Sequence, residues 1–377
     1  MKKIFFTPGP SELFYTVSDH LKKGLIDNVY SLSHRSNEFK KIYEECTFNL
    51  KTLLNIPDDY NIGFLSSANE IWERLINNLI LNNSIHLVNG SFSKKFYNFA
   101  IESGINATKY IYDNEEYKID GIENDSEIIA LTLNETSTGI MCPSNKISEI
   151  RNKFKESFIL LDCVSGIPSL PFNIKDVDTF YFSVQKCFGL PSGLGVWVYN
   201  NRCLDRHNDI RMSKKTGTYH SLHRIHEMSL KSQTPETPNV LAIYLLSKVT
   251  EDMIKIGIDN IRRDTIYKSS LLYNTIKNHQ DLSCYVNDKN IRSKTVIVSN
   301  TLKDNDLFIN GLKRKNLIVG KGYGSSKNQI RIANFPTHSK EVLNCYVMNL
   351  LNYDENICCY RWCQWHWSGI CKTFNKR

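Results

Sequence analysis

Repeated strand–helix units are the feature that most constrains the fold of this 377-residue chain. Apolar segments typical of strands lie at residues 60–65, 85–88, 127–133 and 157–162, and helical patterns separate them at 37–54, 71–81 and 144–155. Further helical patterns lie at 11–24 and 258–278. Polar residues follow the carboxyl end of each strand. Parallel strands joined by helices bring those ends to one edge of a sheet, so the pattern predicts an open, mostly parallel α/β sheet with a ligand site at that edge.

The segment 179–195 places a single lysine between a strand and a turn rich in glycine and proline. Residues 181–184 predict a buried strand, Lys186 follows, and the turn allows backbone to approach a ligand closely. A strand end fixes the amine, and partial burial lowers its pKa, which suits Schiff-base chemistry. The alternative is a surface lysine beside a hairpin, and the local pattern alone favours that alternative.

Three further features at strand ends are candidates for a binding site. Asp162 ends an otherwise apolar strand, where a carboxylate is costly unless it is paired. The sequence Ser66-Ser-Ala-Asn-Glu70 lies between a strand and a helix, so its amides could seat a phosphate, or Ser67 could simply cap the helix. Phe92 could stack on a flat ring or belong to the core.

Basic residues at two places could bind anions. His34 and Arg35 precede the helical pattern 37–54 and could bind an anion at its start, or form a solvated loop. Arg331 lies in the apolar strand 330–333, where a buried guanidinium requires a carboxylate from a ligand or from the protein.

Metal binding is not expected. His220, His223 and His226 are spaced by three, but no carboxylate or cysteine completes a ligand set in the sequence, so a solvated surface is the favoured interpretation. The tail 353–377 is rich in cysteine and tryptophan, yet it has no Cys-x-x-Cys pair and looks like a segment appended to the fold.

Composition narrows the class of protein. Hydrophobic residues make up 41% and charged residues 23%, as in ordinary globular proteins. The net charge of +8 is spread along the chain without a DNA- or RNA-binding motif, which favours small anionic substrates over nucleic acid. There is no dinucleotide or P-loop motif, no signal peptide and no membrane span, and the 11 cysteines are dispersed, so we expect a reducing, cytoplasmic location.

The patterns divide the chain into four parts. We expect an N-terminal arm at 1–15, a large domain at 16–245, a smaller α+β domain at 246–352 and the atypical tail at 353–377.

The motifs together resemble class-V, fold-type I aminotransferases that depend on pyridoxal 5′-phosphate, most closely the phosphoserine aminotransferases, over roughly residues 4–350. They occur in the family's order: Thr7-Pro-Gly-Pro10, Ser33-His-Arg-Ser36, residues 66–70, Asn134-Glu-Thr136 with Gly139, Asp162 with Ser165, Ser183-x-Gln-Lys186, the Thr-Pro loop 233–238, and Arg331. The ordered set reverses the preference stated above for Lys186. It implies a large domain with a mostly parallel seven-stranded sheet and a smaller α+β C-terminal domain.

The resemblance also implies a role for each site residue. Lys186 would form the Schiff base and move the proton, Asp162 would pair with the ring nitrogen, and Arg331 would bind the substrate α-carboxylate. The implied cofactor set is Ser67, Ala68, Phe92, Thr136, Asp162, Ser165, Gln185 and Lys186, joined by Gln233 and Thr234 from the second subunit of a homodimer with shared active sites.

Substrate choice depends on a second anion site. His34 and Arg35 match residues that bind the substrate phosphate in phosphoserine enzymes. A further His-Arg pair that those enzymes carry before the carboxylate arginine is missing, and only Lys321 or Lys327 offers a charge there.

The favoured reaction is a ping-pong transfer through pyridoxamine phosphate, in which L-glutamate and 3-phosphohydroxypyruvate give 2-oxoglutarate and O-phosphoserine for serine biosynthesis. An alanine–glyoxylate or serine–pyruvate type transaminase is the alternative. From a different class, the chain could be a cofactor-free binding or scaffold protein.

Overall fold

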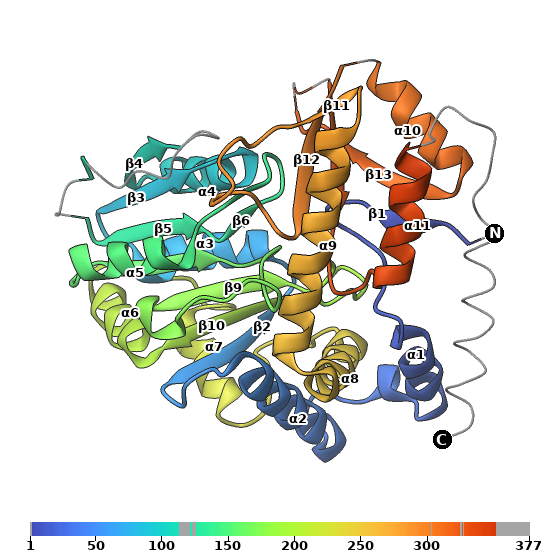
Figure 1. The fold of residues 1–377 in the computed structure, drawn as a ribbon. Helices are drawn as coiled ribbons and strands as arrows, with labels where there is room; N and C mark the ends of the chain where they lie inside the picture. Colours follow the sequence, from blue (N-terminus) through green and yellow to red (C-terminus); the bar gives the residue numbers. More distant parts are fainter. Residues whose placement is uncertain are drawn as a thin grey trace.

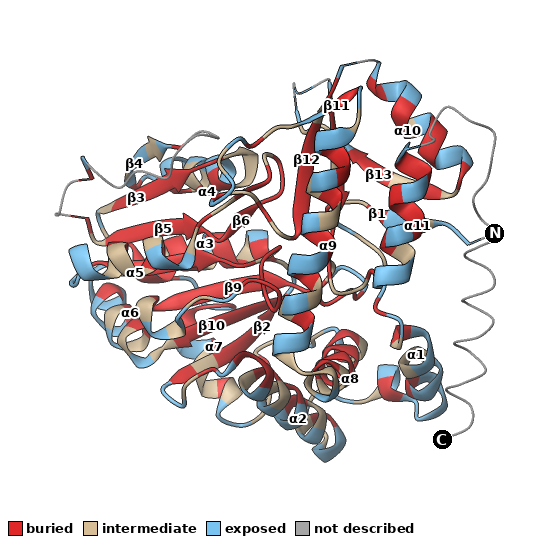
Figure 2. Ribbon diagram, in the orientation of Figure 1, coloured by how far each residue is buried: buried red, intermediate tan, exposed pale blue. Residues whose placement is uncertain are grey.

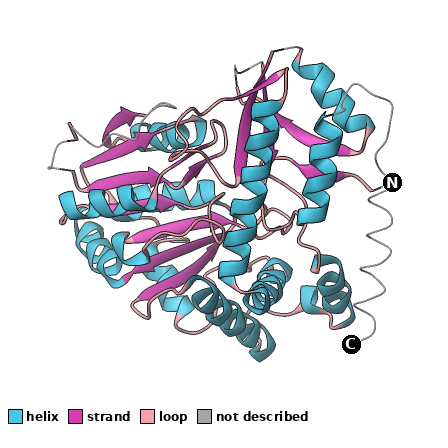
Figure 3. Ribbon diagram, in the orientation of Figure 1, coloured by secondary structure: helices cyan, strands magenta, loops and turns pink. Residues whose placement is uncertain are grey.

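The computed structural model describes residues 2–112, 121–122, 126–302, 304–324, 326 and 328–351. The tail at 353–377 and Lys327 therefore lie outside the described residues. Two sheets form the framework, with helices packed around them (Figures 1 and 3). Among the described helices, none is both long and apolar enough to cross a bilayer, and the cytoplasmic location stays a prediction.

The larger sheet has seven strands, and all but one run in the same direction. The strand order is β2-β10-β9-β8-β5-β3-β4, and only β10 is antiparallel to its neighbours, which confirms the expected architecture. The strands are β2 (Tyr60–Leu65), β3 (Asn83–Val88), β4 (Asn106–Ile111), β5 (Ile128–Thr132), β8 (Phe158–Asp162), β9 (Thr179–Ser183) and β10 (Gly195–Asn200).

Successive residues of the central strands enter two separate cores. In β8, Ile159 and Leu161 pack with the first core, whereas Leu160 packs with the second. The first core includes α2 (Asn37–Leu54), α5 (Ser144–Lys153) and α8 (Val240–Ile256), with α1 (Val17–Ile26) against α8. The second includes α3 (Ala68–Leu79), α4 (Ser91–Glu102), α6 (Asn201–Ser213) and α7 (Leu222–Ser229). The central strands are therefore covered on both faces, which explains why they are buried along their length (Figure 2).

The smaller sheet has five strands in the order β1-β13-β14-β12-β11. Its strands are β1 (Ile4–Phe6), β11 (Leu282–Cys284), β12 (Val296–Thr301), β13 (Leu317–Lys321) and β14 (Gln329–Ala333), and its helices are α9 (Ile258–Asn278), α10 (Asn305–Arg314) and α11 (Lys340–Leu351). The N-terminal strand β1 pairs in parallel with β13, so the start of the chain forms one edge of the smaller sheet (Figure 1). A separate antiparallel ribbon is formed by β6 (Asn134–Glu135) and β7 (Ile140–Met141).

The N-terminal helix begins later than its sequence pattern predicts. The pattern indicated a helix over 11–24, but α1 begins at Val17. The amide of Ser11 donates to the carbonyl of Gln185 at 3.2 Å, and the amide of Phe14 donates to the carbonyl of Gly189 at 2.8 Å. These contacts hold residues 11–14 against the loop that carries Lys186.

Candidate active site

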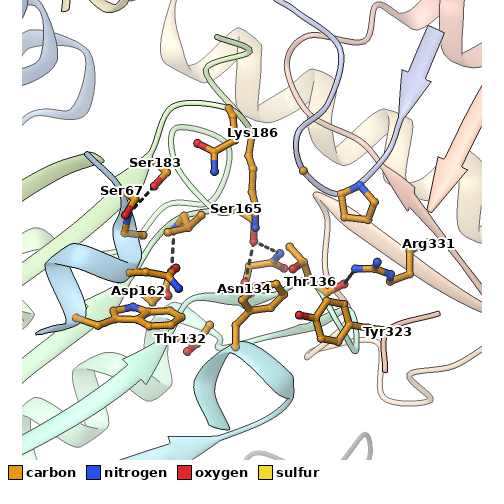
Figure 4. A pocket seen from close by; sticks show the side chains of 18 residues that line it. Ser67, Thr132, Asn134, Thr136, Asp162, Ser165, Ser183, Lys186, Tyr323 and Arg331 are labelled. Atoms are coloured by element: carbon orange, nitrogen blue, oxygen red, sulfur yellow. Dashed lines mark hydrogen bonds between the residues drawn. The ribbon is translucent and has the colours of Figure 1, made fainter. Parts of the chain in front are cut away.

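A cavity of about 200 Å³ lies at the carboxyl ends of the central strands (Figure 4). The pairing register places Thr132 beside Asp162 and Asp162 beside Tyr181, so polar groups from three strands meet at this edge. The cavity is lined by all eight residues that the resemblance assigns to the cofactor within one chain: Ser67, Ala68, Phe92, Thr136, Asp162, Ser165, Gln185 and Lys186. Arg331, from the smaller sheet, lines it as well.

Lys186 extends into this cavity from the loop after β9, and it is only 8% exposed. Burial lowers the pKa of Lys186, although Asp162 and Glu135 oppose the shift. The lysine stem packs against Gly9, where a Cβ atom would lie 2.7 Å from the lysine Cε. Gly9 therefore leaves room for the lysine, and the shifted amine is suited to act as a nucleophile or a base.

Asp162 ends β8 with its carboxylate buried beside the cavity. Its Oδ1 accepts a hydrogen bond from the amide of Val164 at 2.9 Å, and its Oδ2 accepts one from the hydroxyl of Tyr181 at 3.2 Å. Trp72 Nε1 donates to the same hydroxyl at 2.6 Å and so orients it. Burial raises the pKa of Asp162 to about 6. A carboxylate held in this way favours a cationic ligand, because a positive charge would offset its desolvation.

The first turn of α3, for which the sequence predicts an anion-binding cup, lines the cavity. The Ser67 hydroxyl accepts a hydrogen bond from the amide of Glu70 at 3.2 Å, so Ser67 does cap the helix. The amide of Ala68 donates to the Ser183 hydroxyl at 2.9 Å, which ties the cup to β9. A Cβ atom on Gly195 would lie 2.7 Å from the Ser67 carbonyl carbon, so the glycine permits this close approach of β10. The cap does not exclude an anion at this place, because the helix start still lines the cavity.

Arg331 reaches the cavity from β14 with two of its nitrogens already bound. Its Nε donates to the carbonyl of Lys321 at 2.7 Å, and its Nη1 donates to the carbonyl of Thr136 at 3.1 Å. Burial lowers the pKa of this guanidinium. These two bonds aim the rest of the guanidinium at the cavity, where it could bind a carboxylate.

Glu135 is a buried residue that the sequence showed only as a member of a motif. It is 0% exposed, and its Oε2 accepts hydrogen bonds from the amides of Phe92 and Ser93, each at 3.0 Å. Its Oε1 accepts one from the Ser137 hydroxyl at 2.7 Å. Glu135 therefore fixes the start of α4 and, with it, the place of Phe92 in the cavity.

Four predicted residues lie outside the cavity of their own chain. Arg35 Nη1 donates to Gln233 Oε1 at 2.5 Å and to the carbonyl of Thr234 at 3.2 Å, and His34 precedes Arg35 at the start of α2. The structure brings these residues to each other, not to Lys186.

Two sequence interpretations are corrected by the structure. Lys321 is 63% exposed and pairs with Asp306 at 2.6 Å, so it does not supply a charge to the cavity, which Tyr323 lines instead. His220 is not on a solvated surface: it is 3% exposed, between Glu70 and Glu236, with 2.7 Å between His220 Nε2 and Glu236 Oε2. Neither carboxylate is near it in sequence, so the local pattern could not reveal them. No group of residues suited to a metal ion occurs in the described part of the chain.

Comparison with known proteins agrees with this geometry. Residues 4–340 match the family model described as aminotransferase class-V. The crystal structure of a phosphoserine aminotransferase from Cytophaga hutchinsonii is 44% identical, covers 93% of this chain and 98% of its own, and superposes with a TM-score of 0.91. A phosphoserine aminotransferase from Corynebacterium glutamicum is 29% identical over 82% of this chain and 83% of its own. An alanine–glyoxylate aminotransferase from Nostoc shares the fold at 18% identity and a TM-score of 0.83, over 94% of this chain and 96% of its own.

Proposed function

We propose that this chain, which belongs to the class-V aminotransferase family, transfers the amino group between O-phosphoserine and 2-oxoglutarate. Class-V aminotransferases use pyridoxal 5′-phosphate, which when bound supplies an electron sink for reactions at the substrate Cα. The observation that carries the proposal is the convergence of Lys186, Asp162 and Arg331 on one cavity. Relatives of 29–44% identity are named phosphoserine aminotransferases, which supports the substrate.

The cavity residues fit this cofactor. The buried carboxylate of Asp162 suits a protonated ring nitrogen, and the first turn of α3 at Ser67 and Ala68 suits a phosphate. In the proposed arrangement Phe92 would stack on the ring and Thr136 would hydrogen-bond its hydroxyl. Ser165 and Gln185 would complete the contacts from this chain.

In the proposed reaction, different residues of the chain would bind the substrate, transfer the proton and limit the access of water. Arg331 would hold the substrate α-carboxylate, because its guanidinium is already aimed by the carbonyls of Lys321 and Thr136. Lys186 Nζ would take the proton from the substrate Cα and return it, since burial favours the neutral amine that can act as a base. The rings of Phe92 and Tyr323, with centroids 5.1 Å apart, would limit water at that amine.

A second copy of the chain would complete the site. Gln233 and Thr234 would reach the cofactor phosphate of the partner, and His34 and Arg35 would reach the phosphate of its substrate. Support comes from the hydrogen bonds that Arg35 makes to Gln233 and Thr234, which hold the group together away from its own cavity.

Half-reaction spectroscopy tests this proposal. The purified holoenzyme is mixed separately with O-phosphoserine, alanine and serine, and the visible absorbance of the bound cofactor is followed. We expect phosphoserine to change the absorbance at the lowest concentration. A preference for alanine or serine would replace the phosphoserine assignment with the alanine–glyoxylate or serine–pyruvate type. A colourless protein that borohydride leaves unchanged would instead indicate a cofactor-free binding protein.

A further inference from the structure

We propose that Lys95 and Tyr323 of this chain contribute to the subsite for the distal anion of a dianionic substrate, either a side-chain phosphate or a side-chain carboxylate, together with His34 and Arg35 of the partner subunit. The inference rests on the proposed transaminase function and deepens it by assigning residues to the second anion. It concerns a part of the cavity where the sequence offered only Lys321 and Lys327.

The stretch before Arg331 contributes an aromatic residue, Tyr323, to the cavity lining. Lys321 pairs with Asp306 on the surface, whereas Tyr323, two residues later, lines the cavity. The Tyr323 ring centroid lies 5.1 Å from that of Phe92 and 5.3 Å from the Arg331 Cζ. Tyr323 therefore lies close both to Phe92, the ring-stacking candidate, and to Arg331, the carboxylate-binding candidate. Figure 4 shows Tyr323 and Arg331 at the same side of the cavity.

Lys95 is an exposed residue that contacts Tyr323 beside the cavity. Lys95 lies on α4, a helix that packs on the larger sheet, about one turn after Phe92. Its Nζ donates a hydrogen bond to the Tyr323 hydroxyl at 2.8 Å. The same Nζ lies 5.3 Å from the Phe92 ring centroid and 5.4 Å from the Tyr323 ring centroid. No carboxylate of the described residues forms an ion pair with Lys95, so its charge is available to a ligand.

The hydrogen bond between these two residues leaves donors for a ligand. Because the Tyr323 oxygen accepts from Lys95, its own proton is free to be donated, and the ammonium keeps two further N–H groups. One oxyanion could therefore accept from both residues. An ammonium is a point charge that binds phosphate or carboxylate alike, as a transaminase with two dianionic substrates requires.

Three cations surround the two rings, and each has a different task in this proposal. Arg331 lies beside Tyr323 and would bind the α-carboxylate. The Lys186 Nζ lies 5.2 Å from the Phe92 ring centroid and would serve the reacting carbon. Lys95 would then bind the distal anion at the other end of the substrate. A substrate with only one anion, such as alanine, would leave Lys95 unused, so the subsite predicts selectivity.

Substitution of Lys95 tests the subsite in the holoenzyme. We expect Lys95→Met to raise KM for O-phosphoserine and L-glutamate by roughly 10- to 100-fold, with little change for L-alanine. Lys95→Arg should restore much of the loss, and Tyr323→Phe should cause a smaller selective loss. Lys94→Met is the matched control, because Lys94 is an exposed neighbour on the same helix, and it should leave all three KM values unchanged.

Two outcomes would overturn the inference: equal losses for dianionic substrates and alanine, or no loss for either. If phosphoserine is not turned over but the glutamate KM rises selectively, the phosphoserine assignment fails while the subsite stands. If neither dianion reacts, calorimetric binding of glutarate to the holoenzyme replaces turnover. Weaker glutarate binding in Lys95→Met supports the subsite, and unchanged binding rejects it.

Discussion

Lys186 and Lys268 are both buried, but their amines have different surroundings. Lys268 is 2% exposed, and its Nζ donates to the carbonyls of Phe335 at 3.0 Å and His338 at 2.6 Å. Lys186 is 8% exposed, and its Nζ forms no hydrogen bond or ion pair with the described residues. One buried cation is satisfied by the protein, and the other is left for a ligand.

A similar contrast separates the half-buried acids Glu70 and Glu236 from the buried Asp162. Glu70 and Glu236 enclose His220, so each charge has a protein partner. Asp162 has two hydrogen-bond donors but no ion pair with Lys186 among the described contacts, although both line the cavity. Burial without a counter-ion costs stability, so such groups persist where a ligand supplies the missing charge. Satisfied charges should therefore control stability, and unsatisfied charges should control activity.

Replacing each lysine by methionine gives the largest contrast. We expect Lys186→Met to lower kcat by about 10,000-fold or more, because the nucleophile and base are lost, while the apoprotein remains as stable or more stable. Mass spectrometry after borohydride treatment should find cofactor attached to the wild type and none attached to the variant.

Lys268→Met is the matched control. It should keep the covalent attachment but lower the free energy of unfolding by about 2 kcal/mol, because two buried carbonyls lose their donor. Retained turnover in Lys186→Met would contradict the role assigned to that lysine.

Asp162→Asn tests whether the unsatisfied acid serves the ligand. The amide keeps the shape but not the charge, so we expect kcat to fall about 100- to 1,000-fold. The apoprotein should not lose stability, because a buried charge is removed. Steady-state kinetics and urea unfolding of the apoprotein measure the two effects. A marked loss of apoprotein stability, with kcat unchanged, would assign Asp162 to the satisfied group.

His220→Gln tests the satisfied cluster through its pH dependence. Burial disfavours the charge, but hydrogen bonds to Glu236 and Glu70 raise the pKa of His220 to about 9. Because this pKa exceeds that of the unfolded state, the stabilisation is complete below about pH 6.5 and is lost as pH rises through about 9. Burial opposes the charge on Glu70 too, yet hydrogen bonds from His220 and Ser66 lower its pKa to about 2, so its contribution is lost only as pH falls from about 4.5 towards 2.

Urea unfolding at several pH values would measure this effect. Near pH 5.5, His220→Gln should cost on the order of 3 kcal/mol, and the difference from wild type should shrink towards pH 9.5. His223→Gln is the control, because that side chain is 45% exposed and should change little. A difference that does not vary with pH would show that His220 stabilises by packing alone.

Sequence patterns predicted the framework better than the contacts between its parts. The helices at 37–54 and 258–278 have the predicted bounds, because long amphipathic patterns specify a helix locally. The strand β4 was not recognised, since it lies at the sheet edge with mostly exposed residues and lacks an apolar pattern. The later start of α1 depends on hydrogen bonds to the Lys186 loop, which no local pattern records.

The candidate site follows the same division. Asp162 and residues 66–70 stood out as candidates because they follow strands, whereas Lys186 was favoured only when the motifs were taken together in their order. The burial of His220 was not, because its partners Glu70 and Glu236 are brought to it only by folding. Lys95 lies on α4 and Tyr323 in the loop between β13 and β14, so only folding brings the two together and neither stands out in its own segment.

Arg331 combines both kinds of charge, and Arg331→Lys should produce the smallest effect. Two of its nitrogens are bound to carbonyls, while the rest of the guanidinium faces the cavity. A lysine cannot keep both carbonyls and also bind a carboxylate with two parallel bonds, so KM should rise roughly 10-fold for phosphoserine and alanine alike. The free energy of unfolding should fall by only about 1 kcal/mol. An equal rise in KM for both substrates would distinguish Arg331 from Lys95, whose substitution should affect only substrates with a second anion. A rise confined to phosphoserine would instead indicate that Arg331 binds the distal anion.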